Sequence, residues 1–182
     1  MILYRVFPYL ASAEEGEPGH PLYIPTPQGN GRWDNPALYH IRYFAISAEA
    51  AVGEAFANFS TWTPVMLSFP QIPGAERVIG TFLFDEEKHP LLDLDDAENL
   101  AARNMKPTSV VRRNRAASQE IARRIFEEGK WAGIQWWSFH RPQWPLVALW
   151  NEGISFHSAV SIRGHAALTD AASTLYKKLE GF

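Results

Sequence analysis

The chain has 182 residues, of which 46% are hydrophobic and 20% charged, and these proportions are typical of one globular domain. We therefore expect a single domain over residues 1–182. A formal net charge of −3 disfavours direct nucleic-acid binding, which usually goes with a basic excess. Because there is no cysteine, disulfides, thiolate zinc sites, iron–sulfur clusters and cysteine nucleophiles are excluded, and any chemistry has to use oxygen or nitrogen groups.

The N-terminal segment MILYRVFPYL predicts a first strand rather than a signal peptide, because Arg5 interrupts its apolar run and no cleavage site of small residues follows. Proline and charged residues recur along the chain, so no stretch reaches the roughly 20 apolar residues that span a bilayer. We expect a cytoplasmic protein without a membrane role.

Residues 11–31 carry Glu, Gly, Pro and Asn without a period and predict a long loop. The aromatic run 41–47 then predicts a strand, and Ser47 is the expected N-cap of a helix. On that helix Val52, Phe56 and Phe59 share one face, whereas Glu54 lies almost opposite them.

The second half of the sequence mixes strands with isolated helices. Helices are expected at 98–105, at 114–128 before Gly129, and at the C-terminus, where a Thr169 cap precedes an apolar face that extends to Leu179. Strands are expected at 77–85, 91–96, 132–140, 145–150 and 154–162. This irregular order predicts an α+β fold, a single domain with a small mixed or antiparallel sheet and flanking helices.

Several common catalytic motifs are missing from the sequence. The six histidines form no HExxH pair, so we expect no metal site, and no GxSxG segment supports an acyl-transfer triad. Gly29 and Gly31 form only part of a glycine-rich loop, which is a weak indication of dinucleotide binding.

The segment GRWDNPALYHIRYFAISAEAAVGEAF places an arginine, a strand tyrosine and a helix glutamate close together in sequence. It resembles the RES domain, a family named after Arg, Glu and Ser. LYRVFP is similar to the family's first strand and GIQWWSFH to its serine-bearing strand, so the resemblance covers nearly the whole chain. Residue by residue, it implies a site made of Arg32, Tyr43, Glu54 and Ser138.

The resemblance also implies a fold and an activity. RES domains resemble ADP-ribosyltransferases in fold, and the family implies cleavage of NAD⁺ at the nicotinamide glycosidic bond, with phosphate, water or a protein side chain as acceptor. Phosphate is the acceptor we expect first, which would make the protein an NAD⁺ phosphorylase. The family further implies the toxin of a type II toxin–antitoxin pair, held by a helix-turn-helix antitoxin of the Xre type. NAD⁺ is then a substrate, and no further cofactor is expected.

The four residues suit this chemistry. Nicotinamide leaves as a neutral ring, so the transition state is oxocarbenium-like and needs a carboxylate, Glu54, more than an acid. Arg32 is expected to pair with the pyrophosphate, Tyr43 to border the nicotinamide, and Ser138, turned away from its aromatic neighbours on a strand, to bind ribose or phosphate. Asp34 beside Arg32 departs from the family pattern and is expected to neutralise part of its charge.

Three other interpretations stay open at this point. One is an ADP-ribosyltransferase that modifies a protein. Another is a non-catalytic interaction module with an aromatic groove of Trp136, Trp137, Trp144 and Trp150. The third is a nucleic-acid-binding helix face that begins at VRRNR, although glutamates one turn away favour an ion-paired, solvated surface there.

Overall fold

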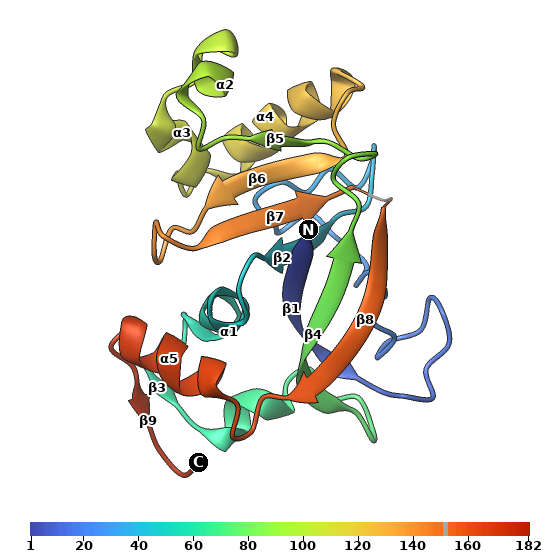
Figure 1. Ribbon diagram of the computed structural model, residues 1–182, viewed down its shortest axis with the longest axis vertical. Helices are drawn as coiled ribbons and strands as arrows, with labels where there is room; N and C mark the ends of the chain where they lie inside the picture. Colours follow the sequence, from blue (N-terminus) through green and yellow to red (C-terminus); the bar gives the residue numbers. More distant parts are fainter. Residues whose placement is uncertain (151–152) are drawn as a thin grey trace. The chain divides into compact units, whose positions relative to one another are not determined.

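A computed structural model describes residues 1–150 and 153–182 (Figure 1). The chain divides into two compact units, which are described separately. Unit 1 contains Met1, Ile24–Phe44 and Phe84–Ile154, and unit 2 contains Ile2–Tyr23, Ala45–Leu83 and Ser155–Phe182.

Unit 1 is built on four strands in the order β5-β6-β7-β2. Their bounds are β2 Arg42–Ala45, β5 Leu91–Asp93, β6 Gly133–Trp137 and β7 Pro145–Leu149. β5 runs parallel to β6, whereas β6 and β7 are antiparallel and pair Ile134 with Ala148. The helices of this unit are α2 Ala97–Ala102, α3 Pro107–Val111 and α4 Arg115–Glu127.

Unit 2 carries the long strands β1 Ile2–Tyr9, β4 Glu76–Phe84 and β8 Ile154–Ser161, which lie side by side in that order (Figure 1). β1 and β4 are antiparallel over their whole length, and Tyr4 of β1 also pairs with Ala45, the last residue of β2. The remaining elements are α1 Ala48–Phe56, the 3-10 helix η1 Pro64–Ser68, α5 Ala166–Thr174 and the parallel pair β3 Thr61–Trp62 with β9 Lys178–Leu179. In unit 2, α1 packs against α5 and β1.

The helix starts follow from local capping. The hydroxyl of Ser47 accepts the N–H of Ala50 at the start of α1, and the side chain of Asn114 accepts the N–H of Ala117 at the start of α4. Such caps satisfy backbone donors that have no partner within the helix. Gly129 follows α4 with a φ of 64°, a left-handed conformation that ends helices and favours glycine.

The structure confirms the α+β class with mostly antiparallel strands, and each expected strand has a counterpart. The expectation for Phe59 was wrong, because α1 ends at Phe56 and Phe59 is 44% exposed beyond it.

The expected helix to the C-terminus was also wrong. The α5 cap is His165, whose Nδ1 accepts the N–H of Ala167, and Thr169 lies inside the helix with its hydroxyl on the carbonyl of Ala166. The helix stops at Thr174, because Tyr176 takes a φ of 54° and the Lys177 N–H closes back onto the Ala172 carbonyl. Beyond that turn, Leu179 belongs to β9.

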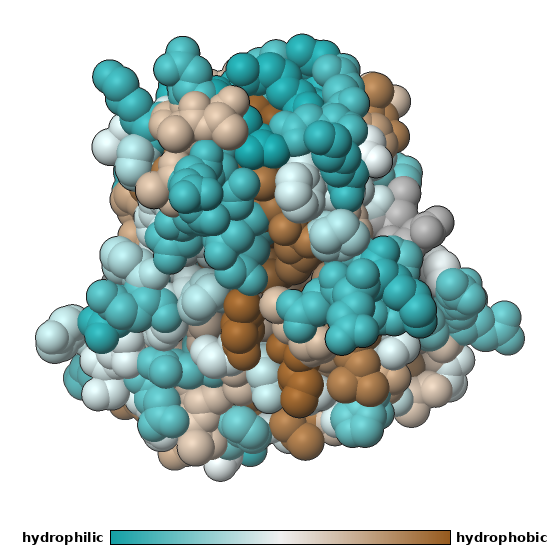
Figure 2. All heavy atoms as spheres, turned by 45° about the horizontal axis from the view of Figure 1, so that its top comes forward, coloured by the Kyte–Doolittle hydropathy of each residue, from teal (hydrophilic) through white to brown (hydrophobic). Residues whose placement is uncertain are grey.

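No helix in the described part of the chain is long and apolar enough to cross a bilayer. On the face shown in Figure 2, hydrophilic side chains predominate. On α4, Arg123 is paired with Glu120 and Glu127, and Arg124 lies 4.0 Å from Glu120. The expected ion-paired surface of this helix is therefore confirmed.

Candidate functional site

A hydrogen-bonded polar cluster of unit 1 joins Tyr43 on β2 to the loop that carries Arg32. The Tyr43 hydroxyl donates to Asp34 Oδ1 at 2.6 Å and accepts the backbone N–H of Trp33 at 2.9 Å. The other carboxylate oxygen of Asp34 accepts the N–H groups of Gly29 and Gly31 at 2.8 and 2.7 Å. Asp34 is only 6% exposed. A buried carboxylate therefore holds the loop closed around a strand tyrosine.

This cluster explains why residue 31 is a glycine. A Cβ at Gly31 would lie 2.2 Å from Asp34 Oδ1 and 2.5 Å from the Tyr43 hydroxyl oxygen, which is closer than atoms can approach. Gly31 of QGNGRW therefore allows the close approach of a carboxylate, which gives this glycine a role that needs no bound dinucleotide.

Two tyrosines of this region have raised pKa values. Burial, with the hydrogen bond to Asp34 as the next cause, raises the pKa of Tyr43 far above its ordinary value near 10. Burial also raises the pKa of Tyr39 to about 12. The Tyr39 hydroxyl donates to the Trp33 carbonyl at 2.7 Å. Both phenols therefore stay neutral at physiological pH.

Arg32 leaves this loop and contacts the end of α3. Its guanidinium donates to the carbonyl oxygens of Val110 at 3.0 Å, Arg112 at 2.6 Å and Val111 at 3.5 Å. The last carbonyls of a helix lack partners within it and carry partial negative charge, so a cation is favourable there. The structure thus fixes the half-buried Arg32 side chain between the loop and α3.

Two glutamines that were not predicted from the sequence bind backbone groups of the Arg32 loop and of Ile41, just before β2. Gln119 on α4 donates to the carbonyls of Gly29 and Gly31 at 2.9 and 3.0 Å. Gln28 both donates to the Ile41 carbonyl at 2.7 Å and accepts its N–H at 2.9 Å. A glutamine about 90 residues away in sequence gives no local pattern, so only the fold identifies it.

Asp34 also has a structural role that was not predicted from the sequence. Its two oxygens are engaged by the two glycine N–H groups and the Tyr43 hydroxyl. The residue expected to neutralise Arg32 is therefore the residue that organises the Arg32 loop.

Ser138 lies just after β6 rather than within it, so the strand alternation expected for it does not apply. Its side chain is fully buried, and its hydroxyl accepts the N–H groups of His140 at 2.9 Å and Arg141 at 3.1 Å. Its own N–H donates to the Trp144 carbonyl. Ser138 therefore shapes the turn between β6 and β7.

Glu54 is a half-buried residue of α1 in unit 2. The helix that carries it is fixed at several points within that unit. Glu49 accepts the Thr174 hydroxyl at 2.6 Å, and the carbonyl of Ala57, which follows the helix, accepts the ammonium of Lys177 at 2.8 Å. Trp62 Nε1 donates to the carbonyl of Phe56 at 3.1 Å. The helix that carries Glu54 is therefore held in place by contacts within unit 2.

Of the four expected site residues, the structure thus gathers three in unit 1. Tyr43 is bonded directly to the Arg32 loop, and both its ring and that of Trp33 meet Trp136 edge to face, with centroids 6.2 and 5.5 Å apart. Trp136 precedes Ser138 by two residues on the same segment. Glu54 belongs to unit 2, on α1.

Three of the four tryptophans of the aromatic groove considered above are buried, and the fourth, Trp137, is half-buried. Trp136, Trp144 and Trp150 are each only 5% exposed, so these rings belong to the core. Among residues 1–150 and 153–182, no group of three His, Asp or Glu side chains is placed to hold a metal ion.

Comparison with known proteins gives one family and one fold. No curated protein matches the chain. A solved structure matches with a TM-score of 0.56 at 15% sequence identity, covering 88% of this chain and 83% of the other, and it is described as the crystal structure of the M. tuberculosis MbcT–MbcA toxin–antitoxin complex. This likeness shows that the fold is shared. The family model for the RES domain matches residues 2–170, and the chain therefore belongs to the RES-domain family.

Proposed function

We propose that this protein is the toxin of a toxin–antitoxin pair and that it cleaves NAD⁺ at the nicotinamide glycosidic bond. The observation that carries the proposal is the RES-domain match over residues 2–170, a range that includes Arg32, Tyr43, Glu54 and Ser138, the residues that we assign to the site. A neighbour of the same fold comes from a toxin–antitoxin complex, which supports an antitoxin as the partner of this chain as well. A helix-turn-helix protein of the Xre type is the partner we propose.

Cleavage of this bond requires the protein to position NAD⁺ and to stabilise the positive charge that develops on the ribose. Nicotinamide leaves the ribose C1′ as a neutral ring and takes the bonding electron pair with it, so positive charge grows on the ribose. In this proposal the carboxylate of Glu54 stabilises that charge, and one preorganised group of this kind is worth about 100-fold in rate. Phosphate attacks C1′ in the reaction that we place first, which yields ADP-ribose 1″-phosphate, and water is the alternative acceptor.

The other residues act in binding. The Arg32 guanidinium is held in a defined place by the end of α3, and we assign it to the pyrophosphate of NAD⁺. Tyr43 stays neutral because its pKa is raised, so we assign its ring to the border of the nicotinamide subsite rather than to proton transfer. Ser138 holds the β6–β7 turn, and we assign this turn to the ribose or phosphate region.

The test is NAD⁺ consumption by the purified full-length protein, with and without inorganic phosphate, with products followed by mass. Glu54→Gln and Arg32→Ala are the test variants. Glu49→Gln is a matched control on the same helix, since a glutamine can still accept the Thr174 hydroxyl, and Arg124→Ala is a control for loss of an exposed guanidinium.

Phosphate-dependent loss of NAD⁺, reduced about 100-fold in Glu54→Gln and normal in Glu49→Gln, is the expected result. Loss that does not depend on phosphate would assign a hydrolase, and ADP-ribose mass on a protein would assign a transferase. A folded, antitoxin-free protein that leaves NAD⁺ intact under all these conditions would refute the proposal.

A further inference from the structure

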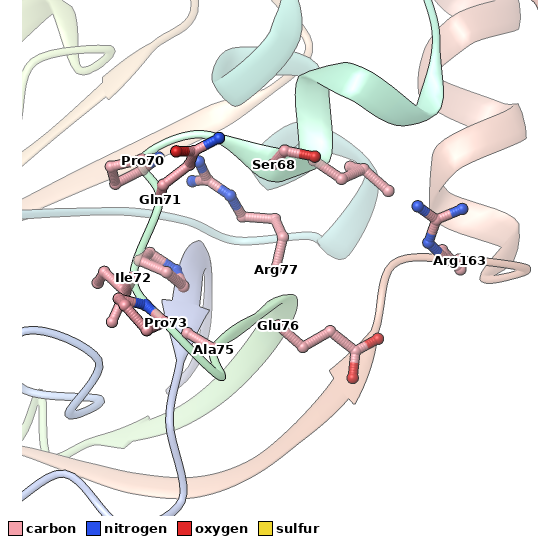
Figure 3. Close-up of a pocket in the computed structure, with 11 residues that line it drawn as sticks. Ser68, Pro70, Gln71, Ile72, Pro73, Ala75, Glu76, Arg77 and Arg163 are labelled. Carbon is pink, nitrogen blue, oxygen red and sulfur yellow. The ribbon is translucent and has the colours of Figure 1, made fainter.

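Unit 2 contains a pocket that none of the four expected site residues lines (Figure 3). Its volume is about 580 Å³, within the range of small-molecule sites. It is formed by the end of β1, the loop that follows η1, the start of β4 and the residue Arg163 after β8. All of these segments belong to unit 2.

The pocket combines an apolar wall with two arginines. Pro8, Pro70, Pro73, Leu67 and Ile72 supply the apolar surface. Figure 3 shows the guanidinium of Arg77 beside the Pro70–Pro73 segment and Arg163 on the other side of the pocket. The antiparallel register pairs Arg77 with Pro8, so both side chains lie on the same face of the β1–β4 ribbon.

The pocket is lined by two arginines and one carboxylate, that of Glu76, which leaves one formal positive charge in excess. None of the ion pairs found among the described residues includes Arg77 or Arg163. The acidic residue of the pocket, Glu76, accepts the hydroxyl of Ser161 at the end of β8. The Ser161 oxygen in turn accepts the backbone N–H of Arg163.

Arg77 is the more buried of the two arginines. Its Nε is buried and has no hydrogen-bond partner in the described part of the chain. Burial lowers its pKa, yet a guanidinium remains charged at neutral pH. Because Arg77 lines the pocket and none of the ion pairs found includes it, an anion that enters the pocket is favoured by the charge of its guanidinium.

We propose that this pocket binds a small organic anion, in which a carboxylate or phosphate group on a compact apolar body pairs with the guanidinium of Arg77. The planar fork of arginine matches the oxygens of both groups. The volume and the proline-rich wall accommodate an apolar body attached to the anionic group. Arg163, which is exposed, adds long-range attraction that salt screens.

The experiment is a titration of the full-length protein with three probes that share one ring: benzoate, phenyl phosphate and the uncharged benzamide. Binding is measured by calorimetry and by amide chemical shifts in a ¹⁵N-labelled sample. We expect benzoate or phenyl phosphate to bind and to shift the amides of Gln71, Ala75 and Arg77, and the stronger of the two identifies the anionic group. Benzamide is expected to bind at least tenfold more weakly.

Variants test the role assigned to each arginine. Arg77→Gln is expected to weaken anion binding by about tenfold or more, because it removes a charge-assisted bond. Arg163→Gln is expected to weaken it about two- to threefold at low salt and not at all at high salt. Arg124→Gln, an exposed arginine of unit 1, is the control and should bind as the wild type does.

The proposal is overturned if neither anion binds at millimolar concentrations, if benzamide binds as well as benzoate, or if Arg77→Gln binds unchanged. Should Arg77→Gln fail to fold, shifts in the wild-type protein that lie outside the pocket would overturn it just as directly. None of these readouts depends on NAD⁺ turnover, so the pocket and the proposed function stand or fall separately.

Discussion

Replacing Asp34 with asparagine tests the buried cluster on which the Arg32 loop is built. The carboxylate accepts three hydrogen bonds, from the N–H groups of Gly29 and Gly31 and from the hydroxyl of Tyr43. An asparagine has only one oxygen. If that oxygen serves the two glycines, the amide NH₂ faces the Tyr43 oxygen, which already accepts the Trp33 N–H, and the phenol proton loses its acceptor.

The magnitude follows from this count. The opposite amide orientation sets an NH₂ against two N–H donors and loses two bonds, so the first orientation is the cheaper one. In this first orientation the Tyr43 hydroxyl loses its hydrogen bond to a charged acceptor, and the two bonds from the glycine N–H groups become bonds to a neutral acceptor. Together these changes lower the unfolding free energy by about 2–3 kcal/mol. For a chain of this size that is a fall of roughly 5–10 °C in Tm.

The assay is denaturant unfolding followed by tryptophan fluorescence and by circular dichroism, because coincident transitions are needed to assign one free energy. Tyr43→Phe alone is expected to cost about 1–3 kcal/mol. The double variant should cost at least about 1 kcal/mol less than the sum of the two, because the phenol proton that Asp34→Asn leaves without an acceptor is gone. Asp95→Asn, an exposed carboxylate in the same unit, should change stability by less than about 0.5 kcal/mol.

Two outcomes would refute the reasoning. If Asp34→Asn changes the unfolding free energy no more than Asp95→Asn does, the carboxylate does not organise the loop. If the Asp34→Asn and Tyr43→Phe costs simply add, the hydroxyl and the carboxylate are not bonded to each other in solution.

Three further predictions concern the same two units. The pKa of Tyr43 is raised in the folded protein, and that of Tyr39 is about 12, so both phenols stabilise the fold fully below the unfolded pKa near 10. This stabilisation is lost as the pH rises above 10, by about 1.4 kcal/mol per tyrosine at pH 11. The unfolding free energy measured from pH 8 to 11.5 tests this, and an equal slope against pH in Tyr43→Phe would contradict it. Gly31→Ala should lower the unfolding free energy by about 2 kcal/mol, because its Cβ would displace the Asp34 carboxylate, and a thermal melt that matches the wild type would show that the loop adjusts. Gly80→Ala should cost about 1–3 kcal/mol, because its Cβ would lie 2.5 Å from the buried ring of Phe7; a neutral result would mean that this core repacks freely.

Much of the fold could be read from local patterns in the sequence. Strand patterns located β1 and β4, the capping residue Ser47 located the start of α1, and helical spacing with Gly129 located α4, because these signals depend on neighbours within one turn or one strand. The same reasoning failed at α5, where a left-handed residue, Tyr176, ends the helix although the apolar spacing continues. A tyrosine does not predict such a turn, because the left-handed conformation is usually taken by glycine or asparagine.

Part of the candidate site could likewise be predicted from the sequence, and part of it could not. The family resemblance selected Arg32, Tyr43, Glu54 and Ser138, and the structure places the first two on one hydrogen-bonded loop and strand. The sequence by itself thus determined the fold class, the family and the order of its motifs. Only the tertiary structure decided that Asp34 holds the Arg32 loop, because that role requires donors from a loop and from a strand to converge on one buried carboxylate. These partners lie only 3 to 9 residues from Asp34 in sequence, but no helix or strand pattern links them, so local propensity does not encode their convergence.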